Sequence, residues 1–157
     1  MSARAQELAR RLDEANAELA RAIDACSDAA WQSRCPEEGW AVGVTAHHVA
    51  ASLPQVAGLV QLIANGQQLP PFTVDMLDRG NAEHARTAAG CTRDETAALL
   101  RDNGAAASRV IAGLSDDQLD RTAQMFMGPM SAEALIEGAM IHHALGHLAS
   151  ISLAAPA

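Results

Sequence analysis

Apolar residues recur every three or four positions through most of this chain, and that spacing restricts most of it to amphipathic helices. In the first stretch the spacing predicts a helix from residue 3 to about residue 25, with Ser2 as its N-cap. One face of this helix carries a continuous apolar stripe: Leu8, Leu12, Ala15, Leu19 and Ile23. Such a stripe must be buried against other helices, so the chain is expected to fold as a packed helical assembly.

The same reasoning predicts four further helices, at about 42–64, 74–88, 92–113 and 131–153. Pro54 lies inside the second of these and removes one backbone donor, which favours a kink. Thr92 and Glu95 have the spacing of a capping box. Residues 27–39, 67–72 and 114–129 are interpreted as loops or connectors. Whether residues 89–91 separate two helices or kink one stays open.

Composition agrees with a fold that contains helices only. The 157 residues include 35 alanines and no tyrosine, and aromatic residues make up 3%. Alanine favours helix, whereas strands are enriched in β-branched and aromatic residues. We therefore predict an all-α fold, a four-helix bundle with one extra short helix, formed as a single domain over residues 1–157.

Charge excludes several classes of partner. The net charge is −8, and the 11 basic residues are all arginines scattered along the chain. Binding to nucleic acid or to an anionic membrane needs grouped basic residues, so neither is expected. The first residues form no apolar signal segment, and we expect a cytoplasmic protein. Three widely spaced cysteines without a CxxC pair argue against a disulfide framework or a thiolate zinc site.

The histidines are the residues that point to chemistry. His143 and His147 are four residues apart, so both rings project from one helix face and can reach one ion. They also continue the apolar stripe of the last helix, which directs them toward the core. His48 lies on the polar shoulder of the buried face of the second helix and could supply a third ligand. The alternative interpretation is that these histidines lie in the core and form hydrogen bonds without a metal.

The remaining polar candidates are assigned weaker roles. His47 lies nearly opposite the buried stripe and is expected to face solvent, while His142 is interpreted as a helix-packing position. His84 is a surface residue, or else a contact to a metal ligand or to the substrate. Gln55 and Asn81 are candidates to line a substrate pocket beside it.

At this point the residues resemble a known family. Trp40-Ala41-Val42, with His48 eight residues after the tryptophan, resembles the first motif of the DinB/YfiT-like superfamily. The segment 143–151, a HxxxH followed by an apolar residue, resembles its second motif. The resemblance implies a four-helix bundle in which three histidines bind a divalent metal, zinc or alternatively nickel. Matched one at a time, His48 is the first ligand, His143 the second and His147 the third.

The resemblance also implies a function. Related proteins include mycothiol-dependent maleylpyruvate isomerase and bacillithiol- or mycothiol-dependent S-transferases, so we expect an enzyme that activates a small nucleophile, a metal-bound water or thiolate. A thiol-dependent S-transferase or isomerase with mycothiol or another low-molecular-weight thiol as co-substrate is the leading hypothesis. A metal-dependent hydrolase and a non-catalytic metal- or ligand-binding bundle are the alternatives. By the same analogy we expect a homodimer that acts on a small molecule.

Overall fold

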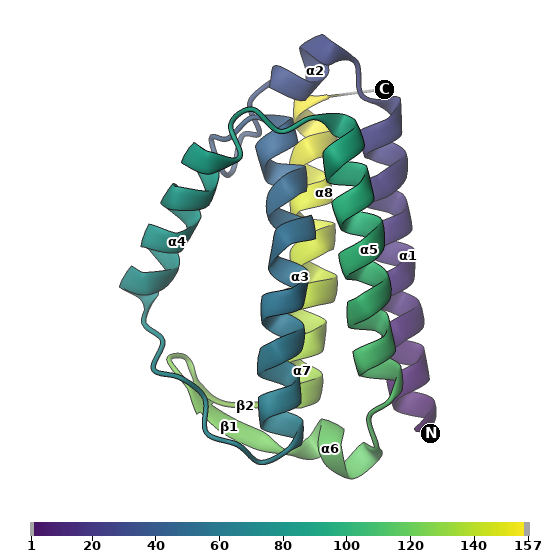
Figure 1. The fold of residues 1–157 in the computed structure, drawn as a ribbon, viewed down its shortest axis with the longest axis vertical. Helices are drawn as coiled ribbons and strands as arrows, with labels where there is room; N and C mark the ends of the chain where they lie inside the picture. The colour runs from purple at the N-terminus through teal and green to yellow at the C-terminus, as the bar shows by residue number, and fades with distance from the viewer. Residues whose placement is uncertain (1, 156–157) are drawn as a thin grey trace.

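The computed structural model describes residues 2–155, and four long helical segments form its bundle (Figure 1). The helices are α1 (Ala3–Ala25), α3 (Val42–Ala64), α5 (Arg93–Ala112) and a composite fourth segment. The fourth segment joins α7 (Ala132–Ile136), the π-helical segment η1 (Glu137–His142) and α8 (His143–Ala154). Neighbouring pairs around the bundle are α1 with α5, α5 with α3, α3 with α8 and α8 with α1. The prediction of a four-helix bundle is confirmed.

The apolar stripes predicted from the sequence form the core. Leu8, Leu12, Leu19 and Ile23 of α1 are all buried. On the fourth segment, Ile136, Met140 and Ile151 are buried as well. The helix starts also match: the side chains of Ser2, Thr73, Thr92 and Ser131 each accept a backbone N–H in the first turn of the helix that follows.

Between the long helices lie smaller elements. The loop predicted over residues 27–39 contains the short helix α2 (Asp28–Gln32). The segment over residues 114–129, interpreted as a connector, contains regular secondary structure. It holds the short helix α6 (Asp116–Asp120) and leads into the antiparallel hairpin of β1 (Thr122–Met125) and β2 (Gly128–Ser131). Gly128, with φ +112°, begins the second strand, in a conformation that suits glycine.

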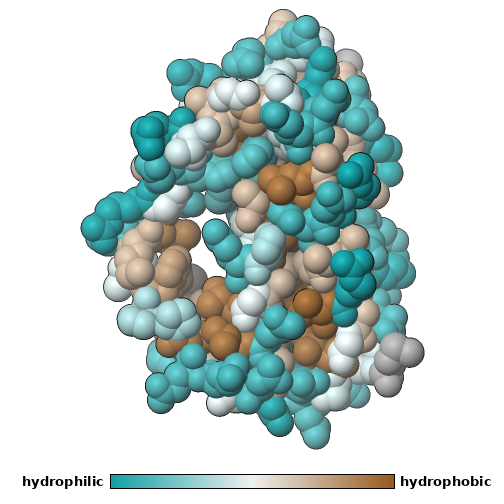
Figure 2. All heavy atoms as spheres, viewed as in Figure 1, coloured by the Kyte–Doolittle hydropathy of each residue, from teal (hydrophilic) through white to brown (hydrophobic). Residues whose placement is uncertain are grey.

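The extra helix, α4 (Val74–Thr87), lies apart from the bundle (Figure 1). It has no buried residue, and residues 88–92 separate it from α5, so the question left open at residues 89–91 is answered as two helices. Figure 2 shows an opening between this helix and the bundle, with hydrophobic residues on part of its border and hydrophilic residues on the rest. The rings of Phe72 and Phe126 lie 5.8 Å apart and join the loop before α4 to the hairpin.

The last helix departs from its predicted form. A continuous α-helix was expected over residues 131–153, but its central six residues are π-helical. The wide turn buries both Met140 and Ile141, and it ends where His143 begins. Single π-turns inside α-helices occur frequently at functional sites.

No helix within residues 2–155 is both long and apolar enough to cross a lipid bilayer.

The start of α3 is held by a close contact with the buried ring of Trp31. An ideal Cβ placed on Gly43 would lie 2.4 Å from Cε2 of Trp31, while nothing lies within 4 Å of the same position on Gly58. The indole also donates a hydrogen bond of 2.9 Å to the carbonyl of Cys91. The ring therefore ties α3 to the start of α5.

We predict that Gly43→Ala lowers the free energy of unfolding by about 1–3 kcal/mol, because the added methyl group overpacks the contact. Gly58→Ala, in the same helix, is the matched control and should raise it by up to about 1 kcal/mol, since alanine is the better helix former. Urea unfolding of both variants measures the difference. Equal stabilities would contradict the role given to the Trp31 contact.

Candidate metal centre

Three histidine rings meet between α3 and α8. The Nε2 atom of His48 lies 3.1 Å from Nε2 of His143, which in turn lies 3.0 Å from Nε2 of His147. The ring centroids of His48 and His147 are 5.3 Å apart. One ligand atom from each ring lies within 4.8 Å of the other two, and all three residues are half-buried. The structure thus brings together the three residues that the sequence singled out.

Burial keeps two rings of this cluster, those of His48 and His143, neutral. Desolvation, followed by repulsion from His143 and His147, lowers the pKa of His48 to about 3. Desolvation and the neighbouring His147 lower the pKa of His143 to about 4, although Glu38 acts in the opposite direction. At neutral pH both imidazoles therefore carry lone pairs that can bind a metal.

The arrangement fits a divalent ion. A neutral imidazole carries one N–H hydrogen, so Nε2 of His143 can donate a well-directed hydrogen bond to only one of its two neighbours. Two nitrogens bound to one ion at about 2.1 Å would lie roughly 3.0–3.4 Å apart for bond angles between 90° and tetrahedral. The observed nitrogen separations of 3.0 and 3.1 Å agree with that range.

Glu38 is the main residue that the sequence analysis missed. Its Oε1 lies 2.5 Å from Nδ1 of His147, and its Oε2 accepts a hydrogen bond of 2.6 Å from the hydroxyl of Ser150. Burial alone would raise the pKa of Glu38, but the hydrogen bonds from Ser150 and His147 outweigh burial and lower it. The carboxylate therefore holds the proton of His147 on Nδ1 and leaves Nε2 as a lone-pair donor facing the cluster.

A short loop delivers Glu38 to this position. Arg34 and Ala41 form an isolated antiparallel bridge, and the amide of Cys35 donates to the carbonyl of Trp40 at 2.8 Å. The turn closes at Gly39, whose φ of +70° is a conformation that favours glycine. The acidic pair 37–38 in front of this glycine was the available signal, but the spacing could not show which carboxylate turns inward.

The same loop places Trp40 against the cluster. Its indole ring meets the ring of His48 edge-on, with centroids 5.3 Å apart. Trp40 is half-buried, whereas Trp31 is the tryptophan buried in the core. Trp40 and Glu38 therefore contact two different members of the histidine cluster from one loop.

A second histidine pair lies beside the first cluster. Nδ1 of His47 is 3.3 Å from Nε2 of His84, and the ring of His84 also meets that of His48, with centroids 5.3 Å apart. The expectation that His47 faces solvent is wrong, because α4 covers it with His84. Desolvation lowers the pKa of both rings. His84 is thus the residue through which α4 reaches the centre.

The two other substrate candidates lie on the helices that carry His48 and His84. Asn81 is half-buried on α4, one turn before His84, and Gln55 is exposed on α3, two turns after His48. Their proposed contact with substrate stays a prediction. His142 is exposed, so its interpretation as a packing position does not hold within one chain.

The fold and the three-histidine cluster define a helical bundle with a candidate metal site. The model of the DinB superfamily matches residues 11–151, and this chain belongs to that superfamily. No curated protein sequence matches the chain.

Solved structures with the same fold are distant in sequence. YfiT from Bacillus subtilis, described as a probable metal-dependent hydrolase with an unusual four-helix bundle topology, matches with a TM-score of 0.73 at 18% identity, over 95% of this chain and 86% of that one. A mycothiol-dependent maleylpyruvate isomerase matches with a TM-score of 0.76 at 15% identity, over 98% of this chain. This chain spans only 62% of the isomerase. An uncharacterized protein from Clostridium difficile 630 matches with a TM-score of 0.77 at 14% identity, over 98% and 96% of the two chains.

Proposed function

We propose that this protein is a divalent-metal-dependent enzyme in which His48, His143 and His147 bind the ion. The observation that carries the proposal is the convergence of three Nε2 atoms, with that of His143 3.1 Å from His48 and 3.0 Å from His147. Zinc suits three imidazole ligands, and nickel is the alternative. The partner is a small molecule, and the predictions of a cytoplasmic homodimer without nucleic acid or membrane partners are retained as part of the proposal.

The residues of the chain prepare the centre for an external nucleophile. Three imidazole ligands place no negative charge directly on the ion, and Glu38 offsets its double positive charge only from behind His147. An ion bound in this way, with a position left open, lowers the pKa of a coordinated thiol or water toward neutrality. Glu38 fixes the ring of His147 and makes its Nε2 a stronger donor, while Trp40 packs against the ring of His48.

The proposed nucleophile is a low-molecular-weight thiol such as mycothiol, and the reaction is S-transfer or isomerisation of a small electrophile. Support comes from the fold shared with the mycothiol-dependent isomerase and from the cationic character of a three-histidine centre, which favours thiolate over thiol. His84, supplied by α4 and in contact with His48, is the best placed of the proposed substrate contacts. Asn81 and Gln55 would lie along the same approach.

Hydrolysis is the second candidate. It is favoured by the fold shared with YfiT and would need water in place of the thiol. A non-catalytic metal-binding bundle with the same three ligands is the remaining alternative. The three hypotheses predict different requirements for turnover.

We predict turnover that depends on both metal and thiol. Zinc- or nickel-loaded protein is incubated with an aryl chloride, an epoxide or maleylpyruvate, together with mycothiol, bacillithiol or glutathione. His48→Ala should lower the rate at least about 100-fold, since it removes one ligand, whereas the exposed neighbour variant His142→Ala should retain it. Cleavage of p-nitrophenyl acetate without thiol would favour the hydrolase. Inactivity of the metal-loaded protein in every reaction would contradict an enzymatic role.

We also predict that Glu38→Gln weakens zinc binding by about 10- to 100-fold, because the amide no longer strengthens His147 as a ligand. The matched control is Glu37→Gln, which changes the exposed acidic neighbour in the same turn. Competition with a chromophoric chelator measures both affinities. If the two variants bind zinc equally well, Glu38 does not support the ligand.

A further inference from the structure

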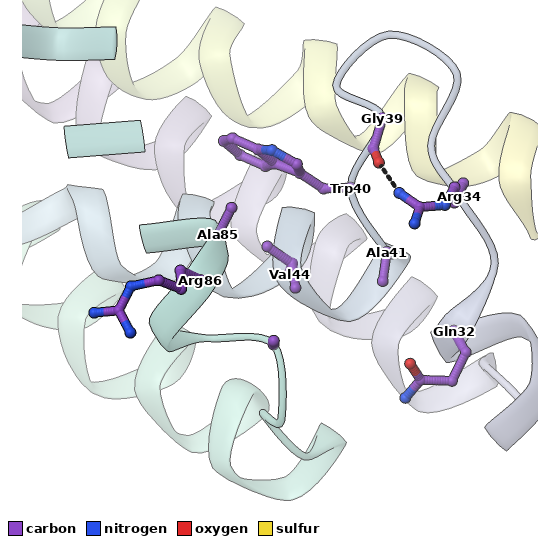
Figure 3. Close-up of a pocket in the computed structure, with 9 residues that line it drawn as sticks. Gln32, Arg34, Gly39, Trp40, Ala41, Val44, Ala85 and Arg86 are labelled. Atoms are coloured by element: carbon purple, nitrogen blue, oxygen red, sulfur yellow. Dashed lines mark hydrogen bonds between the residues drawn. The ribbon is translucent and has the colours of Figure 1, made fainter. Parts of the chain in front are cut away.

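A cleft of about 490 Å³ adjoins the candidate metal centre (Figure 3). It lies between the loop before α3, the first turn of α3 and the end of α4. Trp40, Val44 and Ala85 supply apolar walls, while Arg34, Arg86 and Gln32 supply polar groups.

Trp40 is the wall that the cleft shares with the centre. The indole lines the cleft and also meets the ring of His48, with centroids 5.3 Å apart. On α4, Ala85 directly follows His84, which contacts the same histidine. The indole ring of Trp40 would therefore lie between a molecule in the cleft and the histidine cluster.

Arg34 provides an uncompensated positive charge at this cleft. One of its N–H groups donates to the carbonyl of Gly39 at 2.6 Å, which leaves most of its five donors for other partners. Within residues 2–155, no carboxylate forms an ion pair with Arg34. The other arginine of the cleft, Arg86, is bound on two nitrogens by Glu83, at 2.6 and 3.0 Å.

Figure 3 shows the head groups of Arg34 and Gln32 on one side of the cleft and the indole of Trp40 on another, while the head group of Arg86 turns away. A guanidinium group matches a carboxylate with two parallel hydrogen bonds. The flat indole face suits an apolar or planar portion of a ligand. Together these groups are complementary to a small organic acid.

We propose that the cleft is a binding site for a small carboxylate, with Arg34 pairing with the carboxylate and Trp40 packing against the adjoining carbon skeleton. In the setting of the proposed function, on which this step rests, the ligand is a substrate or thiol co-substrate that carries a carboxylate group. Its reactive end would pass the edge of Trp40 toward the histidine cluster. The binding of the anion itself depends only on the cleft.

The test follows tryptophan fluorescence of the full chain, first free of metal and then loaded with zinc, during titration with benzoate, glutathione or neutral benzyl alcohol. Trp40 is one of only two tryptophans, and Trp40→Phe identifies its share of the signal. Arg34→Gln is the test variant. Arg21→Gln is the matched control, because Arg21 is an exposed arginine on α1 that likewise forms no ion pair in the described part of the chain.

We expect benzoate or glutathione to change the emission of Trp40, benzyl alcohol to bind at least tenfold more weakly than benzoate, and Arg34→Gln to raise the Kd for the acid at least tenfold. Arg21→Gln should leave the Kd unchanged. Response to glutathione alone would support the cleft as the site of the thiol co-substrate. Absence of binding by both acids, or equal affinities of the two arginine variants, would overturn the proposal.

Failure of the proposed carboxylate site can be distinguished from failure of the proposed metal-dependent function. Carboxylate binding that depends on Arg34 in a protein that takes up neither zinc nor nickel supports the cleft and overturns the proposed function. Zinc uptake without carboxylate binding overturns the cleft and leaves the metal centre intact.

Discussion

Neutral, half-buried imidazoles whose ring nitrogens lie close together need a common partner, and the neighbouring residues of the centre orient these rings. Burial lowers the pKa values of His48 and His143 to about 3 and 4, so repulsion between two positive rings is avoided at neutral pH. Their Nε2 atoms lie 3.1 Å apart, and each can offer a lone pair to an ion. A divalent cation satisfies these lone pairs together, whereas a shared hydrogen bond satisfies only part of them.

Two irregular pieces of backbone make this geometry possible. The loop ahead of α3 closes at Gly39 and presents Glu38 to His147 and Trp40 to His48. The π-helical segment η1 ends directly before His143, so the wide turn sets how α8 enters the bundle. The regular helices supply stability and direction, and the irregular segments adjust which atoms meet. The cleft beside Trp40 is formed by the same loop, which couples a proposed binding surface to the proposed metal ligands.

The spacing of apolar residues in the sequence predicted most of the fold and part of the site. The stripe of α1 and the capping box at Thr92 depend on local spacing, and both were predictable from the chain alone. His143 and His147 share a face by the same rule. Glu38 and the His47–His84 pair were not predictable, because they depend on how a loop and α4 fold back on the bundle. The π-helical turn was not predicted either, since a helix of mixed pitch buries nearly the same residues as a regular one.

The hairpin was missed for a related reason. Its strands span four residues each. The first alternates exposed and half-buried residues but is too short for a clear periodicity, and the second begins with Gly128 and Pro129, residue types that are depleted in strands. His48 was a candidate ligand from its place on the second helix, and the family resemblance added the order of the three ligands and the expected chemistry.

The most direct test of the central claim is zinc uptake by untagged, chelator-treated protein, measured by equilibrium dialysis and elemental analysis. The account predicts one zinc per wild-type chain, retained by His142→Ala and lost by His48→Ala and His147→Ala while the variants stay folded. Wild-type protein that takes up no zinc or nickel would contradict the account. So would His48→Ala and His147→Ala variants that bind as much metal as the wild type.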